Sequence, residues 1–154
     1  MDATALARSL LEPVPAHRTA GIQVLRAGDC AAEVALDTPY GLTNVIGSLH
    51  SSGLIALLDA AGLAAVIAAV EAPGEFDGVV PLGAAATVEF LAPARGRLVA
   101  SCALDGSARR ALRGVLCGER DRARLATAAE IRDATGAVVS RGGFDWSVRR
   151  MPRA

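Results

Sequence analysis

One long stretch of apolar and small residues stands near the middle of the chain. From Ser51 to Val70 it reads SSGLIALLDAAGLAAVIAAV, and after the two opening serines Asp59 is the only residue that is neither apolar nor small. A helix that is apolar on all sides is covered by protein on nearly all sides. We therefore expect a buried central helix over 50–71, ended by Pro73 and Gly74, which cannot continue it.

A membrane span is the competing interpretation of this stretch. An acid near the centre of a spanning helix costs about 2.5–3.5 kcal/mol on insertion scales. No Arg lies between Arg26 and Arg95, so neither end of the stretch carries the basic residues that anchor a span. The pattern favours a helix inside a folded domain.

The residues around this helix alternate with a period of two, which is typical of strands. Gly21–Arg26 and Cys30–Leu36 form a predicted hairpin, and four further strands are expected after the helix. In the strand 122–133, charged residues face one side and Leu125, Thr127, Ala129 and Ile131 the other. The last strand follows a turn at 134–136, and its predicted inward face consists of Val138, Phe144, Trp146 and Val148.

These elements predict an α+β fold, an antiparallel sheet wrapped around one long central helix, as a single domain over 1–154. Residues 1–14 are expected to form a short helix that Pro13 stops, with Leu6, Leu10 and Leu11 as its packing face. Residues 106–120 form a helical or loop insertion. Only one helix is available to cover the sheet, so an edge or a face of the sheet is expected to stay exposed. Such an exposed edge or face favours dimerisation.

Composition narrows the classes of function. The chain has only five aromatic residues, which leaves little material for stacking nucleic-acid bases. All sixteen basic residues are Arg, and thirteen of them lie from Arg95 onward. Such an asymmetry fits either an anion-binding half or arginines on the solvent face of a sheet.

Cysteine and histidine offer little chemistry of their own. Cys30, Cys102 and Cys117 match no zinc spacing, and only His17 and His50 could serve as imidazole ligands. We expect no metal, no cofactor and a reduced, cytoplasmic location. The N-terminus lacks the basic start and long apolar run of a secretory signal.

The single acid of the central helix is the strongest candidate for chemistry. No Arg or His lies three or four residues from Asp59, so any compensating partner must come from elsewhere in the fold or from water. One interpretation is structural, with backbone N–H groups or solvent satisfying the acid. The other is a carboxylate that faces a cleft and acts as general base or nucleophile.

The segment NVIGSLHSSGLIALLDAAG resembles the signature of the hotdog-fold acyl-CoA thioesterases, in particular the phenylacetate-pathway type and a related uncharacterised bacterial group. Asn44, Gly47, His50 and Asp59 carry the likeness, with His50 six residues after Asn44 and Asp59 nine after His50. TVEFLAPARGRLVASCAL and RDATGAVVSRGGFDW are similar to the family's later strands, so the resemblance covers about residues 20–148.

The resemblance implies a fold, a substrate and roles for particular residues. Asp59 attacks the thioester or activates a water, Asn44 orients that water or the carbonyl, and backbone N–H groups at Ser51 and Ser52, after His50, receive the oxyanion. The parts come from two subunits of a homodimer or dimer of dimers. The substrate is an acyl group on coenzyme A or an acyl carrier protein, with no nucleic-acid or membrane partner.

Two departures from the family pattern affect the substrate-binding residues. The family commonly has two glycines after the His, where this chain has Ser51 and Ser52, although Gly53 follows. Some members place a hydroxyl side chain on the next strand, where this chain has Gly83 or Ala84. Arg95 and Arg97 could meet coenzyme A phosphates, or could be solvated turn residues.

Three other interpretations remain open. A hydrolase triad of Ser51 or Ser52 with His50 and Asp59 is disfavoured, because neighbours on one helix point in different directions. The others are a hydratase or dehydratase of the same fold and a non-catalytic acyl or hydrophobic-ligand binding protein. An acid facing a pocket at a dimer interface favours an enzyme, and an acid locked to an arginine favours the binding protein.

Overall fold

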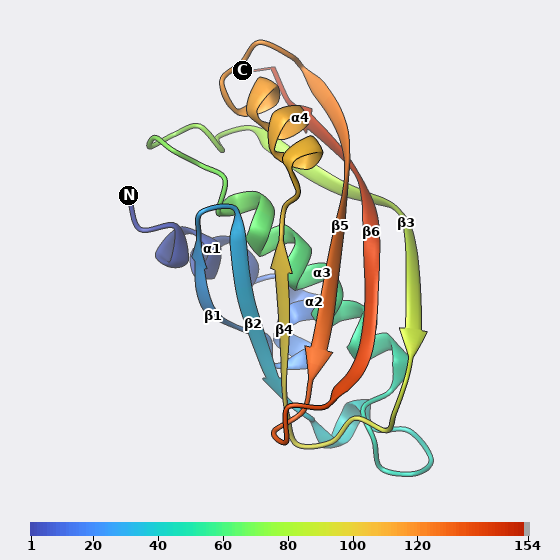
Figure 1. Ribbon diagram of the computed structural model, residues 1–154. Coiled ribbons are helices and arrows are strands. Elements are labelled where there is room, and N and C mark those ends of the chain that lie inside the picture. The colour runs from blue at the N-terminus through green and yellow to red at the C-terminus, as the bar shows by residue number, and fades with distance from the viewer. Residues whose placement is uncertain (153–154) are drawn as a thin grey trace.

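The computed structural model describes residues 1–152, so the last two residues of the predicted domain 1–154 lie outside it. A six-stranded antiparallel sheet curves around one long helix, α3 (Figure 1). The strand order is β1-β2-β4-β5-β6-β3, so β1 and β3 are the two edges. The strands are β1 (Gln23–Gly28), β2 (Ala31–Asp37), β3 (Val79–Phe90), β4 (Arg97–Ala103), β5 (Arg122–Arg132) and β6 (Val138–Arg150). The predicted α+β class is confirmed.

Helix α3 (Ser51–Ile67) has most of its apolar residues buried, as its sequence predicts, although Ile55 is exposed. It ends four residues before the predicted boundary at residue 71. The chain tightens there into turns, with the N–H groups of Ala69 and Val70 bonding the carbonyls of Val66 and Ile67. Because Cys30 donates its N–H to the carbonyl of Ala68, the helix end is tied to the first hairpin.

The first hairpin forms where the sequence predicts it. Its turn places Asp29 and Cys30 at positive φ, 52° and 61°, the geometry of a tight hairpin connection. The alternation predicted for β5 is also confirmed, with Leu125, Thr127, Ala129 and Ile131 buried and their neighbours outside.

The inward face of β6 differs from the prediction at one residue. Trp146 and Val148 are buried, but Val139 is buried where Val138 was expected, and Val138 is only half-buried. The pairing of β5 with β6 shifts between Ile131 and Arg132, which leaves Val139 as an extra residue. A bulge of this kind moves the following residues to the other face of the sheet.

The short helix predicted within residues 1–14 forms, and a second helix that was not predicted follows it. Helix α1 (Ala3–Leu11) buries Ala7 and Leu11, whereas Leu10, expected in the packing face, is exposed. Helix α2 (Pro15–Ala20) begins at a proline, which suits the first position of a helix because its missing N–H is not needed there. Both helices contact α3.

The insertion at 106–120 contains a helix, α4 (Gly106–Leu116). Asp105 caps it by accepting the N–H of Ala108 at 2.7 Å. No helix within residues 1–152 is both long enough and apolar enough to cross a membrane.

Several large apolar side chains stay exposed around the start of α3 and along β3. Ile55 of α3 and Val45 and Ile46 of the preceding loop are exposed, as are four residues on or just beyond β3: Val80, Leu82, Phe90 and Leu91. β3 is also a free edge of twelve residues. Long, apolar, unpaired edges are templates for pairing with another chain.

Candidate active site

The first turn of α3 carries a free hydrogen-bond donor. His50 caps the helix: its Nδ1 accepts the backbone N–H of Ser52 at 3.1 Å and lies 2.8 Å from the hydroxyl of Ser52. The imidazole therefore acts at this position as a helix cap. The N–H of Ser51, at the first helical position, has no hydrogen-bond partner among residues 1–152. It points out of the helix start, where the macrodipole favours negative charge.

Asn44 organises the loop that precedes the helix. Its Oδ1 accepts the N–H groups of Ile46 and Ser48, both at 3.1 Å, and its Nδ2 donates to the hydroxyl of Ser48. Gly47 adopts a φ of +72°, which favours glycine. Arg95 donates to the carbonyl of Ile46 at 2.7 Å, tying this loop to the segment after β3. The side chain of Asn44 thus holds the loop closed.

A cavity of about 340 Å³ lies at the helix start. Asn44, Ser51 and Phe90 are among the residues that line it. The remaining lining residues are mostly apolar: Ile46, Ser48, Leu49, Leu54, Leu91, Ala92, Pro93 and Ala94. Gly47, His50 and Ser52, which the sequence also assigned to the site, are not in this lining. An apolar cavity with a few polar groups is the usual form of a small-molecule site.

Asp59 lies elsewhere, beside α2. Its Oδ2 is 3.1 Å from Nε2 of His17, and its side chain is 29% exposed while that of His17 is 4% exposed. Its Oδ1 has no hydrogen-bond partner among residues 1–152. Asp59 belongs to the one stripe of α3 that is not fully buried, with Ile55 and Leu63 one turn to either side. The acid is therefore partnered on one oxygen, and its side chain is partly exposed.

His17 is held from both ring nitrogens. Its Nδ1 lies 2.8 Å from the carbonyl oxygen of Leu11, at the end of α1. Burial by itself would lower the pKa of His17, but the hydrogen bonds to Asp59 and to the Leu11 carbonyl, with the charge of Asp59, outweigh burial and raise the pKa above its ordinary value of 6.5. The imidazolium form is thereby favoured.

Within one chain, Asp59 and the helix start do not meet. Eight residues separate Ser51 from Asp59, which corresponds to about 12 Å along a helix. Asp59 is also absent from the lining of the cavity at Ser51. A single carbonyl group cannot contact both in one protomer.

The other expected substrate-binding residues lie apart from one another. Gly83 and Ala84 lie on the free edge of β3, at a register shift in its pairing with β6 that leaves Ala84 unpaired. Arg97 is paired with Asp37 at 3.1 Å and also bonds Gln23, away from the cavity. Only Arg95, through its bond to Ile46, lies beside the cavity.

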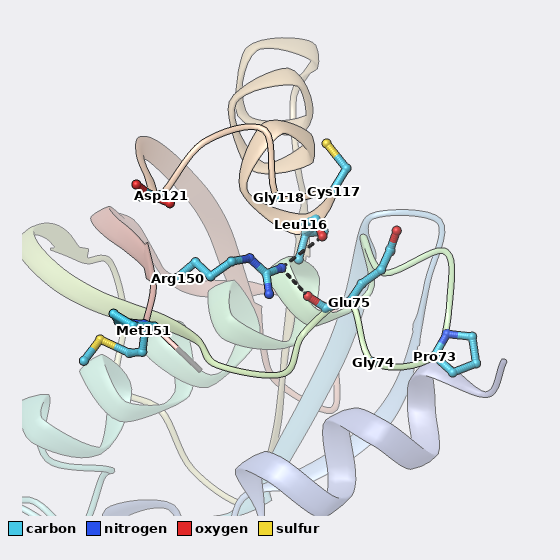
Figure 2. A pocket seen from close by; sticks show the side chains of 10 residues that line it. Pro73, Gly74, Glu75, Leu116, Cys117, Gly118, Asp121, Arg150 and Met151 are labelled. Atoms are coloured by element: carbon cyan, nitrogen blue, oxygen red, sulfur yellow. Dashed lines mark hydrogen bonds between the residues drawn. The ribbon is translucent and has the colours of Figure 1, made fainter. Parts of the chain in front are cut away.

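A larger cavity, of about 850 Å³, lies at the other end of the molecule, between α4 and the chain after α3 (Figure 2). Arg150 donates from this wall to the backbone carbonyls of Leu116 and Glu75, as the dashed lines in Figure 2 show. It also bonds the carbonyls of Val115 and Asp77. Because its guanidinium joins the end of α4 to the loop after α3, we assign it a structural role.

No group of three His, Cys, Asp or Glu residues within 1–152 is arranged to hold a metal ion. The three cysteines are free, and burial raises the pKa of Cys102 to about 11. The partner of Asp59 is the functional residue that sequence reasoning missed. His17 was considered only as a metal ligand, and no periodicity relates two residues 42 positions apart.

Comparison with solved structures identifies the fold. A Pseudomonas aeruginosa protein of unknown function, called a probable thioesterase, aligns with a TM-score of 0.76 at 23% identity, covering 96% of each chain. A thioesterase family protein from Silicibacter pomeroyi aligns with a TM-score of 0.72 at 17% identity, covering 97% of this chain and 99% of its own. The E. coli PaaI protein from the phenylacetic acid degradation operon aligns with a TM-score of 0.68 at 18% identity, covering 97% of this chain and 94% of its own.

At these identities the likeness establishes the hotdog fold, and it confirms the resemblance found in the sequence. No curated protein matches the chain. The family model described as a domain of unknown function, DUF4442, matches residues 3–148. The chain therefore belongs to the DUF4442 family.

Proposed function

We propose that this protein hydrolyses an acyl thioester carried on coenzyme A or on an acyl carrier protein, with Asp59 as the catalytic carboxylate. The observation that carries the proposal is the state of Asp59, a half-buried acid with one oxygen held by His17 and the other without a partner in the described chain. A carboxylate oxygen that no protein group occupies can accept a proton from an attacking water. The solved thioesterases of the same fold support this choice of reaction.

The proposed site is shared by two chains. Since Ser51 and Asp59 of one chain are about 12 Å apart along α3, the partner's copy must supply one of them. The free edge of β3 and the exposed apolar side chains beside it offer a surface for that partner. In a two-fold dimer joined there, the start of α3 in one chain approaches the middle of α3 in the other.

The reaction follows from these groups. A water attacks the thioester carbon and gives its proton to Oδ1 of Asp59, while the carbonyl oxygen becomes an oxyanion. The N–H of Ser51, at the positive end of α3, donates to that oxygen. When the tetrahedral intermediate collapses, the C–S bond breaks and the thiolate takes the proton back from Asp59. The products are a carboxylic acid and a thiol.

Two alternatives fit the geometry less well. A hydratase or dehydratase of this fold requires a histidine that reaches the substrate, and the His beside the acid, His17, is almost fully buried behind Asp59. A non-catalytic binding protein would have its acid locked, and Asp59 keeps one oxygen free of protein partners within the described residues.

The first experiment measures thiol release from a panel of aliphatic and aromatic acyl-CoA thioesters by the wild type and Asp59→Asn. We expect the variant to lose about 10²–10⁴-fold in kcat, the usual contribution of a general base, while keeping its oligomeric state. Enoyl-CoA hydration is assayed in parallel. Equal turnover by the two proteins would overturn the role of Asp59, and hydration without thiol release would favour the hydratase.

A further inference from the structure

A proton must lie between His17 and Asp59. The carbonyl oxygen of Leu11, 2.8 Å from Nδ1, can only accept, so Nδ1 carries a hydrogen. Nε2 and Oδ2 then face each other at 3.1 Å, and one of them must donate. The pair is either imidazolium with carboxylate or neutral imidazole with carboxylic acid. Only the first leaves Asp59 able to accept a proton from water.

We propose that His17 is a positioning residue for the proposed reaction: its protonated imidazole holds Oδ2 of Asp59 and turns Oδ1 toward the attacking water. This inference rests on the thioester hydrolysis proposed above. His17 is 3% exposed and contacts no substrate, so it acts through Asp59 alone. Three elements build the arrangement, since α1 supplies the carbonyl, α2 the imidazole and α3 the carboxylate.

Among residues 1–152, no other charged side chain pairs with Asp59. Asp59 is the only ionisable residue of α3. On α1, Arg8 bonds the carbonyls of Val24 and Leu25, and Glu12, just after α1, accepts the N–H of Val24. On α2, Arg18 is exposed.

The charged side chains of the strands packed against α3 pair with one another, bond backbone carbonyls or are exposed. Arg26 of β1 pairs with Glu33 of β2, and on the remaining strands Asp37–Arg97, Glu89–Arg141 and Glu130–Arg132 are paired. The other charged residues of β5 and β6 are Arg122, Arg124, Asp145, Arg149 and Arg150; the first four are exposed, and Arg150 bonds backbone carbonyls near α4.

The arrangement makes activity depend on the proton of His17. When His17 loses that proton as the pH rises through its raised pKa, the lone pair of Nε2 faces Oδ2, and two acceptors repel each other. Asp59 then leaves its position, and turnover falls. The raised pKa of His17 places this loss on the alkaline side of 6.5.

Two variants separate positioning from simple packing. In His17→Gln the side-chain amide can donate to Asp59 at the place of Nε2 but does not titrate. In His17→Leu the donor is absent. We expect His17→Leu to lose about tenfold to a hundredfold in kcat, the effect of a misplaced catalytic group, with KM little changed. We expect His17→Gln to keep most of the activity and to lose the alkaline fall in the pH profile.

The outcomes distinguish the two proposals. If the wild type releases no thiol from any substrate, the proposed function and this inference both fail. If the wild type is active and His17→Leu shows the same kcat and pH profile, the positioning role alone is wrong. A His17→Gln profile that still falls at alkaline pH also overturns it.

A second measurement needs no substrate. The imidazole of His17 is titrated by NMR in the wild type and in Asp59→Asn. We expect the pKa of His17 to fall in the variant, because the carboxylate that raises it is gone. An unchanged titration would show that no proton is shared between the two side chains, and it would overturn the inference.

Discussion

The carboxylate of Asp59 meets the imidazole of His17, 42 residues earlier in the chain, with 3.1 Å between Oδ2 and Nε2. A histidine differs from an arginine as a partner because its charge titrates near neutral pH. It also occupies only one oxygen of the acid. The pairing therefore stabilises the acid inside the fold and leaves its second oxygen without a partner among residues 1–152.

The same contact predicts how stability depends on pH. The pKa of His17 is raised in the folded state, so its contribution to stability is complete below the unfolded value of about 6.5 and is lost as the pH rises through the folded value. Urea unfolding of the wild type should show a midpoint that declines across this alkaline range. His17→Leu, which removes the titrating group, should flatten this part of the curve. A decline of the same size in His17→Leu would assign the effect to other groups.

The oxyanion donor is tested by a matched pair at Ser51. His50 has φ −61° and ψ 150°, a conformation that a following proline accepts, and proline suits the first helical position. Ser51→Pro thus removes the N–H with little harm to the helix, whereas Ser51→Ala keeps the N–H and removes the hydroxyl. We expect about 10²–10³-fold loss of kcat in Ser51→Pro and near wild-type kcat in Ser51→Ala. The reverse order would make the hydroxyl the functional group.

Subunit mixing tests whether the site is shared. Asp59→Asn and Ser51→Pro each inactivate both sites of their own homodimers. A mixed dimer carries both changes in one site and neither in the other, so denaturing and refolding the two variants together should restore about a quarter of the wild-type activity. Each variant refolded alone serves as the control. A mixture as inactive as its components would place Ser51 and Asp59 of one chain in the same site.

Close packing of α3 on the sheet predicts the effect of a single methyl group. A Cβ on Gly62 would lie 2.7 Å from Oγ1 of Thr127 and 3.1 Å from the ring of Trp146. Alanine gains about 1 kcal/mol over glycine in a helix, but overpacking a core costs about 1–3 kcal/mol. Gly62→Ala should therefore lower the free energy of unfolding by about 1 kcal/mol.

The control for this variant is Gly41→Ala. A Cβ there meets nothing within 4 Å, and the glycine has no positive φ. Both variants are compared by urea unfolding. A stabilised Gly62→Ala would mean that Thr127 and Trp146 shift at little cost, although Trp146 Nε1 donates to Thr127 Oγ1 at 2.8 Å.

Predictions from sequence succeeded where the signal is local and periodic. The alternation of buried and exposed residues from Leu125 to Ile131 was enough to predict β5, and the length of the apolar run was enough to predict most of α3. They failed where a single residue changes the register or starts a new element. The extra residue at Val139 and the second helix beginning at Pro15 are such cases, and neither leaves a periodic pattern.

The sequence by itself determined that one acid lies in an apolar helix. It also determined that Asn44, His50 and Asp59 have the spacing found in hotdog-fold thioesterases, because spacing along the chain can be read without knowing the fold. Only the tertiary structure decided that His17 holds Asp59, that His50 caps the helix and that Asn44 closes its own loop. The physical reason is that a half-buried acid favours a partner, but which side chain meets it depends on how α1 and α2 pack on α3.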